Sequence, residues 1–260
     1  MAEQGDAEAQ HNLAVMFDVA DDIPNNKIKA FQWYRKAAEQ GHPRAQYNLG
    51  VSYDIGEGTS QSDAKAFKWY RKAAVQGHVR AQYNLGSMYA SGVGTTESDT
   101  EALKWFRKAA DEGHPSAQYN LGVMYDVGEG VSKDNVKAFA WYRKAAEQGH
   151  INAQYNLAVM LEVGDGTEEN KMEAFKWYRS AARQGHAEAQ SILGMMYYSG
   201  EIVPKSKPKA YLWWLFAAYE GMDVAVNGLD ILKQEMTKEE KEAGADLLKR
   251  CLESDFQTCD

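Results

Sequence analysis

Hydrophobic and polar residues alternate along this chain in a pattern typical of a helix followed by a turn. Ala45, Leu49 and Tyr53 recur at every fourth position. That spacing places the three side chains on one face of a helix. Two glycines follow, Gly56 and Gly58. We expect them to end the helix, because glycine readily adopts the left-handed conformation found at helix C-termini.

A second helix is predicted to follow that turn. Ser62 or Asp63 can cap its first turn, because their side-chain oxygens accept hydrogen bonds from free backbone N–H groups. Gly77 closes the helix. Its inward-facing residues are predicted to be Ala66, Tyr70, Ala73 and Ala74. The segment is therefore expected to form one helix–turn–helix unit.

The same unit recurs at a fixed interval of 36 residues. Glycine keeps this interval at Gly5, Gly41, Gly77, Gly113, Gly149, Gly185 and Gly221. Tryptophan keeps it at Trp33, Trp69, Trp105, Trp141, Trp177 and Trp213. A single unit cannot bury its own apolar face, so successive units stack and share a core. The sequence therefore predicts an all-α solenoid of antiparallel helix pairs, in which the tryptophans fill the space between successive units.

Composition narrows the classes of function. The 260 residues are 44% hydrophobic and 25% charged, and the formal net charge is −8. This acidic balance argues against a nucleic acid as the partner, because phosphates attract a basic surface. No run of the sequence approaches the roughly 20 apolar residues that a membrane-spanning helix needs. Membrane insertion is therefore not expected.

The repeated residues resemble a known family. The units follow the pattern Ala-x-x-x-Leu-Gly-x-x-Tyr-x-x-Gly-x-Gly and then Lys-Ala-x-x-Trp-Tyr-x-Lys-Ala-Ala-x-x-Gly. This pattern is similar to the Sel1-like repeat, a relative of the tetratricopeptide repeat, over about residues 5–222. The resemblance implies a right-handed superhelix, a bacterial source and work as an interaction scaffold. It also implies that a partner binds the concave face, which the first helices line.

The register of the repeats sets the expected organisation of the chain. Residues 1–222 are expected to hold six repeats, at 7–40, 43–76, 79–112, 115–148, 151–184 and 187–220. Residues 223–260 are expected to form capping helices and a tail. In this part Thr237 and Glu240 are predicted to form a capping box, and Leu247, Leu248 and Leu252 to face inward.

The start of the chain bears on localisation. Residues 2–5 repeat the sequence of residues 38–41, which end a second helix. The N-terminus is therefore expected to be truncated, so the localisation stays unknown. A periplasmic or secreted location is favoured over a cytoplasmic one.

Two columns of side chains on the first helices are candidates for binding. With Leu49 in the core, Tyr47 points to the opposite side and Asn48 flanks it. The columns comprise Tyr47, Tyr83, Tyr119 and Tyr155, and Asn48, Asn84, Asn120 and Asn156. Tyrosine offers a large, rigid contact area, and an asparagine amide can bond to an extended peptide. A structural alternative is that the tyrosines pack between units and the asparagines bond to neighbouring backbone.

A third column on the first helices is acidic. It comprises Asp18, Asp54, Asp126 and Glu162, and Ala90 interrupts it. A carboxylate in the last turn of a helix faces the negative end of the helix dipole, which costs roughly 0.3–1 kcal/mol. Asp54, Asp126 and Glu162 are therefore added to the candidate residues, and a basic partner is expected to suit them. Solubility is the alternative explanation.

The second helices have the opposite charge. Arg71 and Lys72, like their equivalents in other units, lie late in the helix on its outer face. Cations at this end of a helix suit the dipole. A solvated face is the favoured interpretation, and contact with an anionic surface is the alternative.

A histidine follows the repeat glycine in five units. These residues are His42, His78, His114, His150 and His186. Equivalent positions in adjacent units would lie roughly 10 Å apart. A zinc ion, in contrast, holds imidazole nitrogens at about 2.0–2.1 Å. The histidines are therefore interpreted as polar turn residues, and no metal site, cofactor or catalytic residue is predicted.

Two cysteines, Cys251 and Cys259, stand near the C-terminus. In one continuous helix their Cα atoms would be about 12 Å apart, which is too far for a disulfide. A disulfide therefore requires the helix to end near Ser254 and the tail to fold back. It would imply an oxidising compartment. Two free cysteines are the alternative.

The leading functional hypothesis is a non-enzymatic scaffold that binds a protein or peptide on the concave face. A structural spacer within a larger envelope or signalling protein is the alternative. A third hypothesis, a hydrolase or β-lactam-binding enzyme, comes from activities credited to cysteine-rich relatives, and no catalytic constellation supports it here. The identity of the partner and the oligomeric state stay open.

Overall fold

The computed structural model describes residues 1–20, 26–254, 256 and 259. Within these residues the chain forms helices and no strand. A short 3-10 helix, η1 (Ala2–Gln4), comes first. The α-helices are α1 (Ala7–Asp18), α2 (Asn26–Glu39), α3 (Pro43–Ile55), α4 (Asp63–Val75), α5 (Val79–Ser91), α6 (Asp99–Asp111), α7 (Pro115–Val127), α8 (Asn135–Glu147), α9 (Ile151–Val163), α10 (Lys171–Arg183), α11 (Ala187–Ser199), α12 (Lys207–Tyr219), α13 (Asp223–Glu235) and α14 (Lys238–Glu253). The predicted all-α class is confirmed.

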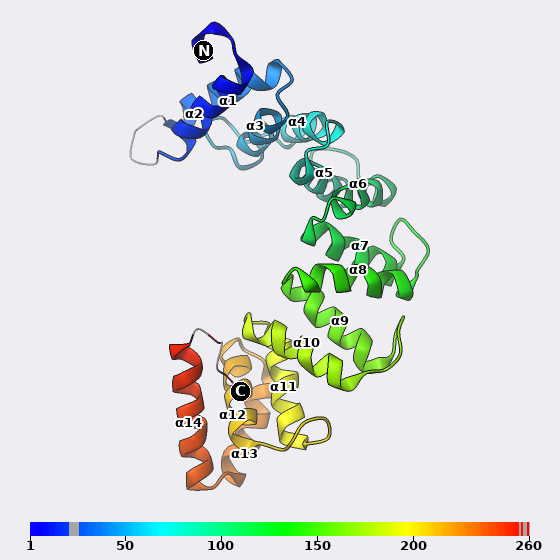
Figure 1. The fold of residues 1–260 in the computed structure, drawn as a ribbon, viewed down its shortest axis with the longest axis vertical. Coiled ribbons are helices and arrows are strands. Elements are labelled where there is room, and N and C mark those ends of the chain that lie inside the picture. The colour runs from blue at the N-terminus through cyan, green and yellow to red at the C-terminus, as the bar shows by residue number, and fades with distance from the viewer. Residues whose placement is uncertain (21–25, 255, 257–258, 260) are drawn as a thin grey trace. The chain divides into compact units, whose positions relative to one another are not determined.

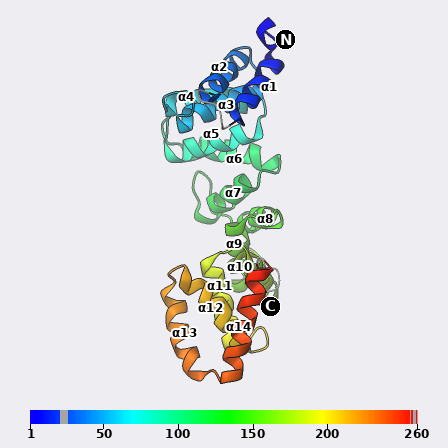
Figure 2. The same ribbon diagram turned by 90° about the vertical axis from the view of Figure 1, so that its left-hand side faces the viewer.

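The helices form two compact units, residues 1–133 and 134–260. In the first unit, α1 to α7, the main contacts join each helix to the next one along the chain (Figure 1). In the second unit the same holds from α8 to α12. There α12 also contacts both α13 and α14, which close the C-terminal end (Figure 2). Each unit is thus a stack of helix pairs.

Each repeat begins its first helix with a histidine cap. Nδ1 of His42 accepts a hydrogen bond from the backbone N–H of Ala45, 3.1 Å away. The other four repeat histidines cap α5, α7, α9 and α11 in the same way. At the other end, Gly56 adopts a left-handed conformation with φ 74° and ends α3. The predicted ends of the first helices are therefore confirmed.

The second glycine of the turn allows two repeats to approach closely. Gly58 also has a positive φ, of 71°. A Cβ atom at this position would overlap the backbone carbonyl of Lys27, at the start of the preceding second helix. The Gly-x-Gly pair therefore ends a helix with its first residue and contacts the neighbouring repeat with its second.

The second helices begin at side-chain caps in most repeats. Ser98, Asp134, Asn170 and Ser206 each accept a hydrogen bond from the backbone N–H three residues later. Ser62 occupies the N-cap position of α4, but its side chain makes no such bond. The second helices therefore start where the sequence predicts.

The core within a repeat is built from small residues around one aromatic ring. Ala66 and Ala73 are completely buried, and Tyr70 is 1% exposed. The ring of Tyr70 lies over Gly50 of the first helix, where an added Cβ would come within 2.6 Å of Cδ1. The predicted inward positions are confirmed, and a small residue beneath the ring brings the two helices together.

The tryptophans were expected to fill the space between repeats, and the structure fully buries only two of the six. Trp105 and Trp213 are buried. Four others are only half-buried: Trp33, Trp69, Trp141 and Trp177. The interior is already filled by the tyrosine that follows each of these residues, so the indole lies at the edge. The ammonium of Lys72 lies 4.2 Å from the Trp69 ring centroid, which is a cation–π contact.

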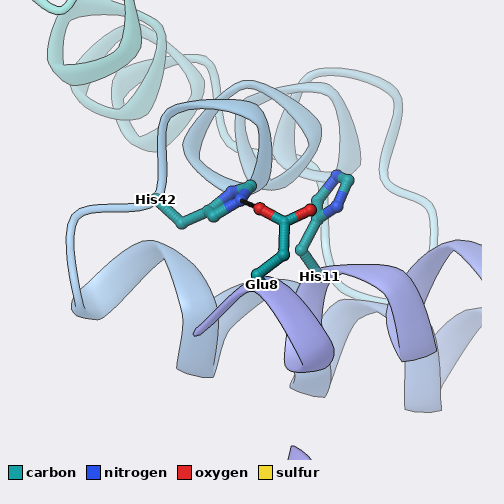
Figure 3. Close-up of side chains that lie close together, drawn as sticks. All are labelled: Glu8, His11 and His42. Carbon is teal, nitrogen blue, oxygen red and sulfur yellow. Dashed lines mark hydrogen bonds and ion pairs between the residues drawn. The ribbon is translucent and has the colours of Figure 1, made fainter. Parts of the chain in front are cut away.

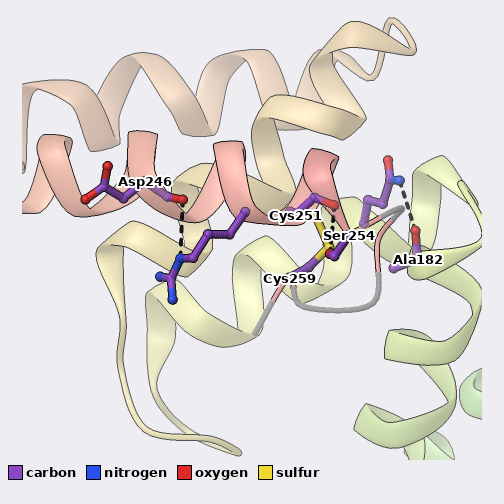
Figure 4. Close-up of a disulfide and its surroundings, with 7 residues drawn as sticks. Ala182, Asp246, Cys251, Ser254 and Cys259 are labelled. Carbon is purple, nitrogen blue, oxygen red and sulfur yellow. Dashed lines mark hydrogen bonds between the residues drawn. A yellow bond between two sulfur atoms is a disulfide. The ribbon is translucent and has the colours of Figure 1, made fainter.

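The C-terminal end is closed by α14 and a disulfide. Thr237 and Glu240 form the predicted capping box. The helix ends at Glu253, and the tail returns so that Cys251 and Cys259 are bonded, with Cα atoms 4.4 Å apart (Figure 4). Both cysteines are fully buried.

The inward face of α14 is narrower than the sequence predicts. Leu247 is buried and Leu248 half-buried. Leu252, which was expected to face inward, is 55% exposed. It lies in the last turn of the helix, where Cys251 takes the buried position instead.

Candidate binding surface

The tyrosine column stacks on the histidines of the following repeats. Tyr47 lies against His78, with ring centroids 4.5 Å apart and planes 20° apart. The same stack joins Tyr83 to His114 at 4.6 Å and Tyr155 to His186 at 4.4 Å. All four predicted tyrosines, including Tyr119, are half-buried. The column therefore packs between repeats, as the structural alternative holds, and also presents part of each ring at the surface.

His78, in the first of these stacks, is a neutral hydrogen-bond donor. Nδ1 of His78 accepts the N–H of Ala81 at 3.3 Å, so the ring proton is on Nε2. Burial lowers the pKa of His78, and the charges of Arg80 and Arg44 lower it further. His78 is therefore uncharged near pH 7 and carries an N–H donor on its outer edge.

The acidic column accepts hydrogen bonds from buried tyrosines of the second helices. Tyr70 donates its hydroxyl to Asp54 at 3.0 Å. The equivalent pairs are Tyr34 with Asp18 at 3.1 Å and Tyr178 with Glu162 at 2.6 Å. Where Ala90 interrupts the column, the second helix carries Phe106, which has no hydroxyl to donate. These carboxylates thus have a structural role within the repeat.

The asparagine column of the following repeat influences the same hydroxyls. The amides of Asn84 and Asn48 act to lower the pKa of Tyr70 and of Tyr34. Burial, followed by the charge of Asp54, raises the pKa of Tyr70 far above its usual range, whereas the Asn84 amide lowers it. The hydroxyl of Tyr70 therefore stays protonated and donates to the acid of its own repeat.

The remaining candidates are divided between the two units. Asn120 is half-buried on α7, and Asn156 is half-buried on α9. Asp126 is half-buried near the end of α7, and its Oδ1 lies 3.9 Å from Nζ of Lys133. The candidates up to Asp126 therefore belong to the first unit, and Tyr155, Asn156 and Glu162 belong to the second.

A hollow of about 530 Å³ opens beside two of the candidate residues, in the first unit. Tyr47 and Asn48 line it, together with Arg44, His78 and Arg80. His11, Val15, Gly77 and Val79 complete the lining. Two arginines, Arg44 and Arg80, thus lie beside the tyrosine and asparagine columns in this unit.

A cluster near the N-terminus brings together Glu8, His11 and His42 (Figure 3). One potential ligand atom from each lies within 4.8 Å of the others. However, Nδ1 of His42 accepts the N–H of Ala45, so the Nε2 proton points at Glu8 Oε2, 2.9 Å away. A metal ion would need the Nε2 lone pair instead. The cluster therefore fits a hydrogen-bonded helix cap better than a metal centre.

The ring of His11 supports the same interpretation. His11 stands at the tyrosine position of the first repeat and stacks on His42, with centroids 4.7 Å apart and planes 23° apart. Nitrogen lone pairs lie in the plane of each ring, so stacked rings do not point them at one common ion. Burial lowers the pKa of His11, which keeps this ring neutral as well.

Sequence reasoning missed the hydroxyl–carboxylate pairs, although a signal for them exists. Tyr70 was assigned to the core and Asp54 to the surface, because each helix was considered separately. The unit that lacks the acid, at Ala90, also lacks the hydroxyl, at Phe106. The acid and the hydroxyl are thus lost together in one repeat. Such a joint loss is expected when the two residues contact each other.

The stacked helix pairs with an aromatic and polar first-helix surface define a repeat scaffold. The Sel1 repeat model matches residues 7–42, 43–78, 79–114, 115–150, 151–186 and 187–222. The chain therefore belongs to the Sel1 repeat family, whose members are generally non-enzymatic scaffolds for protein–protein interaction.

Three solved structures are similar to this chain to different degrees. The chain is similar to a Sel1 repeat protein from Oxalobacter formigenes, with 37% identity over 82% of this chain and 86% of that one, and a TM-score of 0.72. A protective antigen of uropathogenic Escherichia coli is 27% identical over 98% of this chain and 71% of that one, with a TM-score of 0.44. Helicobacter pylori cysteine rich protein B is 25% identical over 51% and 98% of the two chains, at 0.41. No curated protein matches the sequence.

The helices can be checked for their ability to span a membrane. In the described part of the chain, no helix has both the length and the apolar character that are needed to cross a bilayer.

Proposed function

We propose that this protein is a non-enzymatic scaffold that binds a protein or peptide along the first-helix surface. The contact residues are the tyrosines and asparagines of the predicted columns, with the hollow beside Tyr47 and Asn48 as one part of the surface. This is the surface expected to line the concave face. A role as a structural spacer is the alternative.

The observation that carries the proposal is the stacking of the tyrosines. Tyr47 and Tyr83 are held by the rings of His78 and His114, so little side-chain freedom remains to be lost on binding. Both side chains nevertheless stay partly exposed. Rigid, partly exposed aromatic rings are typical of the residues that dominate binding energy at interfaces.

The acidic column is not needed for this contact. Asp54 and Glu162 already accept hydrogen bonds from Tyr70 and Tyr178. The expectation of a basic partner rested on these carboxylates having no local purpose. The proposal therefore rests on the aromatic and amide columns alone.

The proposal is tested by placing a photo-crosslinking side chain at Tyr83. The same group at Lys68, which is exposed on the second helix α4, is the matched control. In a lysate of the source organism, we expect the first position to capture one specific protein and the second to capture none. The captured protein is then produced pure for binding measurements.

Two substitutions separate contact from folding. Tyr83→Ala removes the ring and is expected to weaken binding of that protein at least tenfold, whereas Tyr83→Phe keeps the stack and most of the affinity. Circular dichroism checks that both variants stay helical. Equal affinity of the alanine variant and the native chain, or capture at Lys68 alone, would contradict the proposal and favour the spacer.

A further inference from the structure

We propose that the hollow beside Tyr47 binds an acidic peptide segment, with a carboxylate held at Nε2–H of His78 between Arg44 and Arg80. The inference rests on the proposed scaffold function and names the kind of partner that this part of the surface takes. It reverses the sign of the partner charge that the sequence alone suggested.

The first observation is that neither arginine has an internal partner. Within the described residues, no carboxylate oxygen lies within 4.0 Å of the guanidinium of Arg44 or Arg80, and neither side chain makes a hydrogen bond. Both residues are exposed, and both line the hollow. Arg143, in contrast, is paired with Glu173 at 2.8 Å. In a chain with a net charge of −8, two unpaired arginines around one hollow form a local basic site.

The second observation is that this basic site is confined to two repeats. The equivalent positions in the other repeats are Glu8, Ser116, Asn152 and Glu188. A requirement of the fold would recur in every repeat, as the capping histidine does from His42 to His186. The two arginines therefore belong to this one place on the chain and not to the repeat architecture.

The third observation comes from the first repeat, which already contains the contact that we propose. There Glu8 stands at the position of Arg44, and its carboxylate accepts Nε2–H of His42 at 2.9 Å (Figure 3). His78 is held by the same cap, with its Nδ1 bonded to the Ala81 N–H. Among the described residues, however, nothing accepts its Nε2–H. The first repeat thus shows that a carboxylate fits against Nε2–H of the capping histidine. In the hollow, the same position at His78 is open to a carboxylate of a ligand.

The surrounding charges favour an anion at this point. The hollow includes Val79 and Arg80, the first residues of α5, where the helix dipole is positive. Asn48 also lines the hollow. Arginine pairs with carboxylates through two parallel hydrogen bonds, which also fix the orientation of the ligand.

The test uses labelled peptides of six glutamates, six glutamines and six lysines, and fluorescence anisotropy at low ionic strength. We expect only the glutamate peptide to bind, and its affinity to fall as salt is added, because the arginines are exposed. Arg44→Glu copies the residue of the first repeat and offers His78 an internal carboxylate. It is expected to reduce binding at least tenfold, and Arg80→Ser, which copies the fourth repeat, to reduce it several-fold.

Arg71→Ser is the matched control, because Arg71 is also exposed but lies on the second helix α4. We expect it to leave binding unchanged. His78→Asn should keep the helix cap but remove the imidazole Nε2–H from the proposed binding position, and so weaken binding of the peptide. An equal loss of affinity for the glutamate peptide in Arg71→Ser and Arg44→Glu would overturn the inference. Equal binding of the glutamine and glutamate peptides would also overturn it.

Competition with inorganic phosphate tests whether the hollow binds a phosphate group and not a peptide carboxylate. Displacement of the peptide by phosphate at concentrations where acetate has no effect would show that the hollow prefers a phosphate group, and would overturn the peptide assignment. If the glutamate peptide does not bind while Tyr83 still captures a protein, this inference fails and the scaffold function stands.

Discussion

The first helix of each repeat buries a glutamine at the same position. Nε2 of Gln46 donates to the carbonyl of Ala38 at 3.2 Å, and its Oε1 accepts from Gln76 at 2.7 Å. The equivalent Gln82 keeps the first bond, but its Oε1 has no partner. Glu112 stands where Gln76 would be, and a carboxylate has no N–H to donate. The residue at the position of Gln76 therefore decides whether Oε1 of the buried glutamine receives a hydrogen bond.

We expect Glu112→Gln to stabilise the protein. The new amide can donate to Gln82 Oε1, and a buried hydrogen bond of this kind contributes about 1 kcal/mol. The melting temperature should rise by about 2–4 °C. Gln76→Glu is the reciprocal control, because it should leave Gln46 Oε1 without a donor and lower the melting temperature. A fall with Glu112→Gln would show that the two side chains do not meet.

At the residue scale, the sequence identified which positions recur but not what they contact. Burial of Tyr70 follows from its spacing with Ala66 and Ala73. Its bond to Asp54 requires the first and second helices to be in register, and that register is set where the ring meets Gly50. A helical wheel treats one helix at a time. It therefore finds the columns and misses their partners.

At the scale of the element, a histidine takes the place of the usual capping residue. Serine, threonine, aspartate and asparagine are preferred at N-caps, and no pattern of that kind marks His42 or His78. The sequence therefore predicted only a polar turn. The structure shows why histidine suits this place. One nitrogen caps the helix, and the flat ring also supports the tyrosine of the preceding repeat, which a serine could not do.

The capping histidines should make stability depend on pH. Burial lowers the pKa of His78, His150 and His186 in the folded chain. Between the lowered pKa and the ordinary value of about 6.5, the unfolded chain binds more protons than the folded one, so stability is lost as the pH falls through this range. The melting temperature is expected to be lower at pH 5 than at pH 7.5.

Asparagine at the same three positions tests the cause. It can cap a helix but does not titrate in this range. The triple variant should be less stable at pH 7.5, because it loses the stacked rings, but its melting temperature should vary less between the two pH values. Equal pH dependence of the native chain and the variant would show that other groups control this loss.

The placement of the tryptophans shows where prediction at the element scale ends. Trp69 and Tyr70 are adjacent in sequence and about 100° apart around the helix, so periodicity allows either ring to face the core. Tyr70 was expected to face inward within the repeat, and Trp69 to fill the space between repeats. Gly50 leaves room for the phenol ring of Tyr70 to lie directly over it. Trp69 is partly exposed, with the ammonium of Lys72 over its ring. The close approach of the two helices therefore decides which ring faces the core. This approach cannot be read from the spacing of residues alone.

At the scale of the whole molecule, stability is expected to be local. Within each unit the main contacts join helices that are neighbours along the chain, apart from the closing helices α13 and α14. In such a stack the free energy of unfolding is approximately a sum of repeat and nearest-neighbour contributions. A change at one end should therefore affect the helices near it and leave distant repeats unaltered.

The disulfide at the C-terminus allows this locality to be measured. Cys251 and Cys259 tie the tail back to α14, and Phe256 of the closed loop lies 5.1 Å from Phe216 of α12, centroid to centroid. Closing so short a loop contributes about 2–3 kcal/mol in the chain-entropy account. Reduction, or Cys259→Ser, should therefore speed amide exchange in α12 and α14, while exchange in α3 to α5 keeps its native rate. Hydrogen exchange followed by mass spectrometry resolves the two regions in one experiment. Equal acceleration in both regions would mean that the chain unfolds as a single cooperative body, and the additive description of this stack would then be wrong.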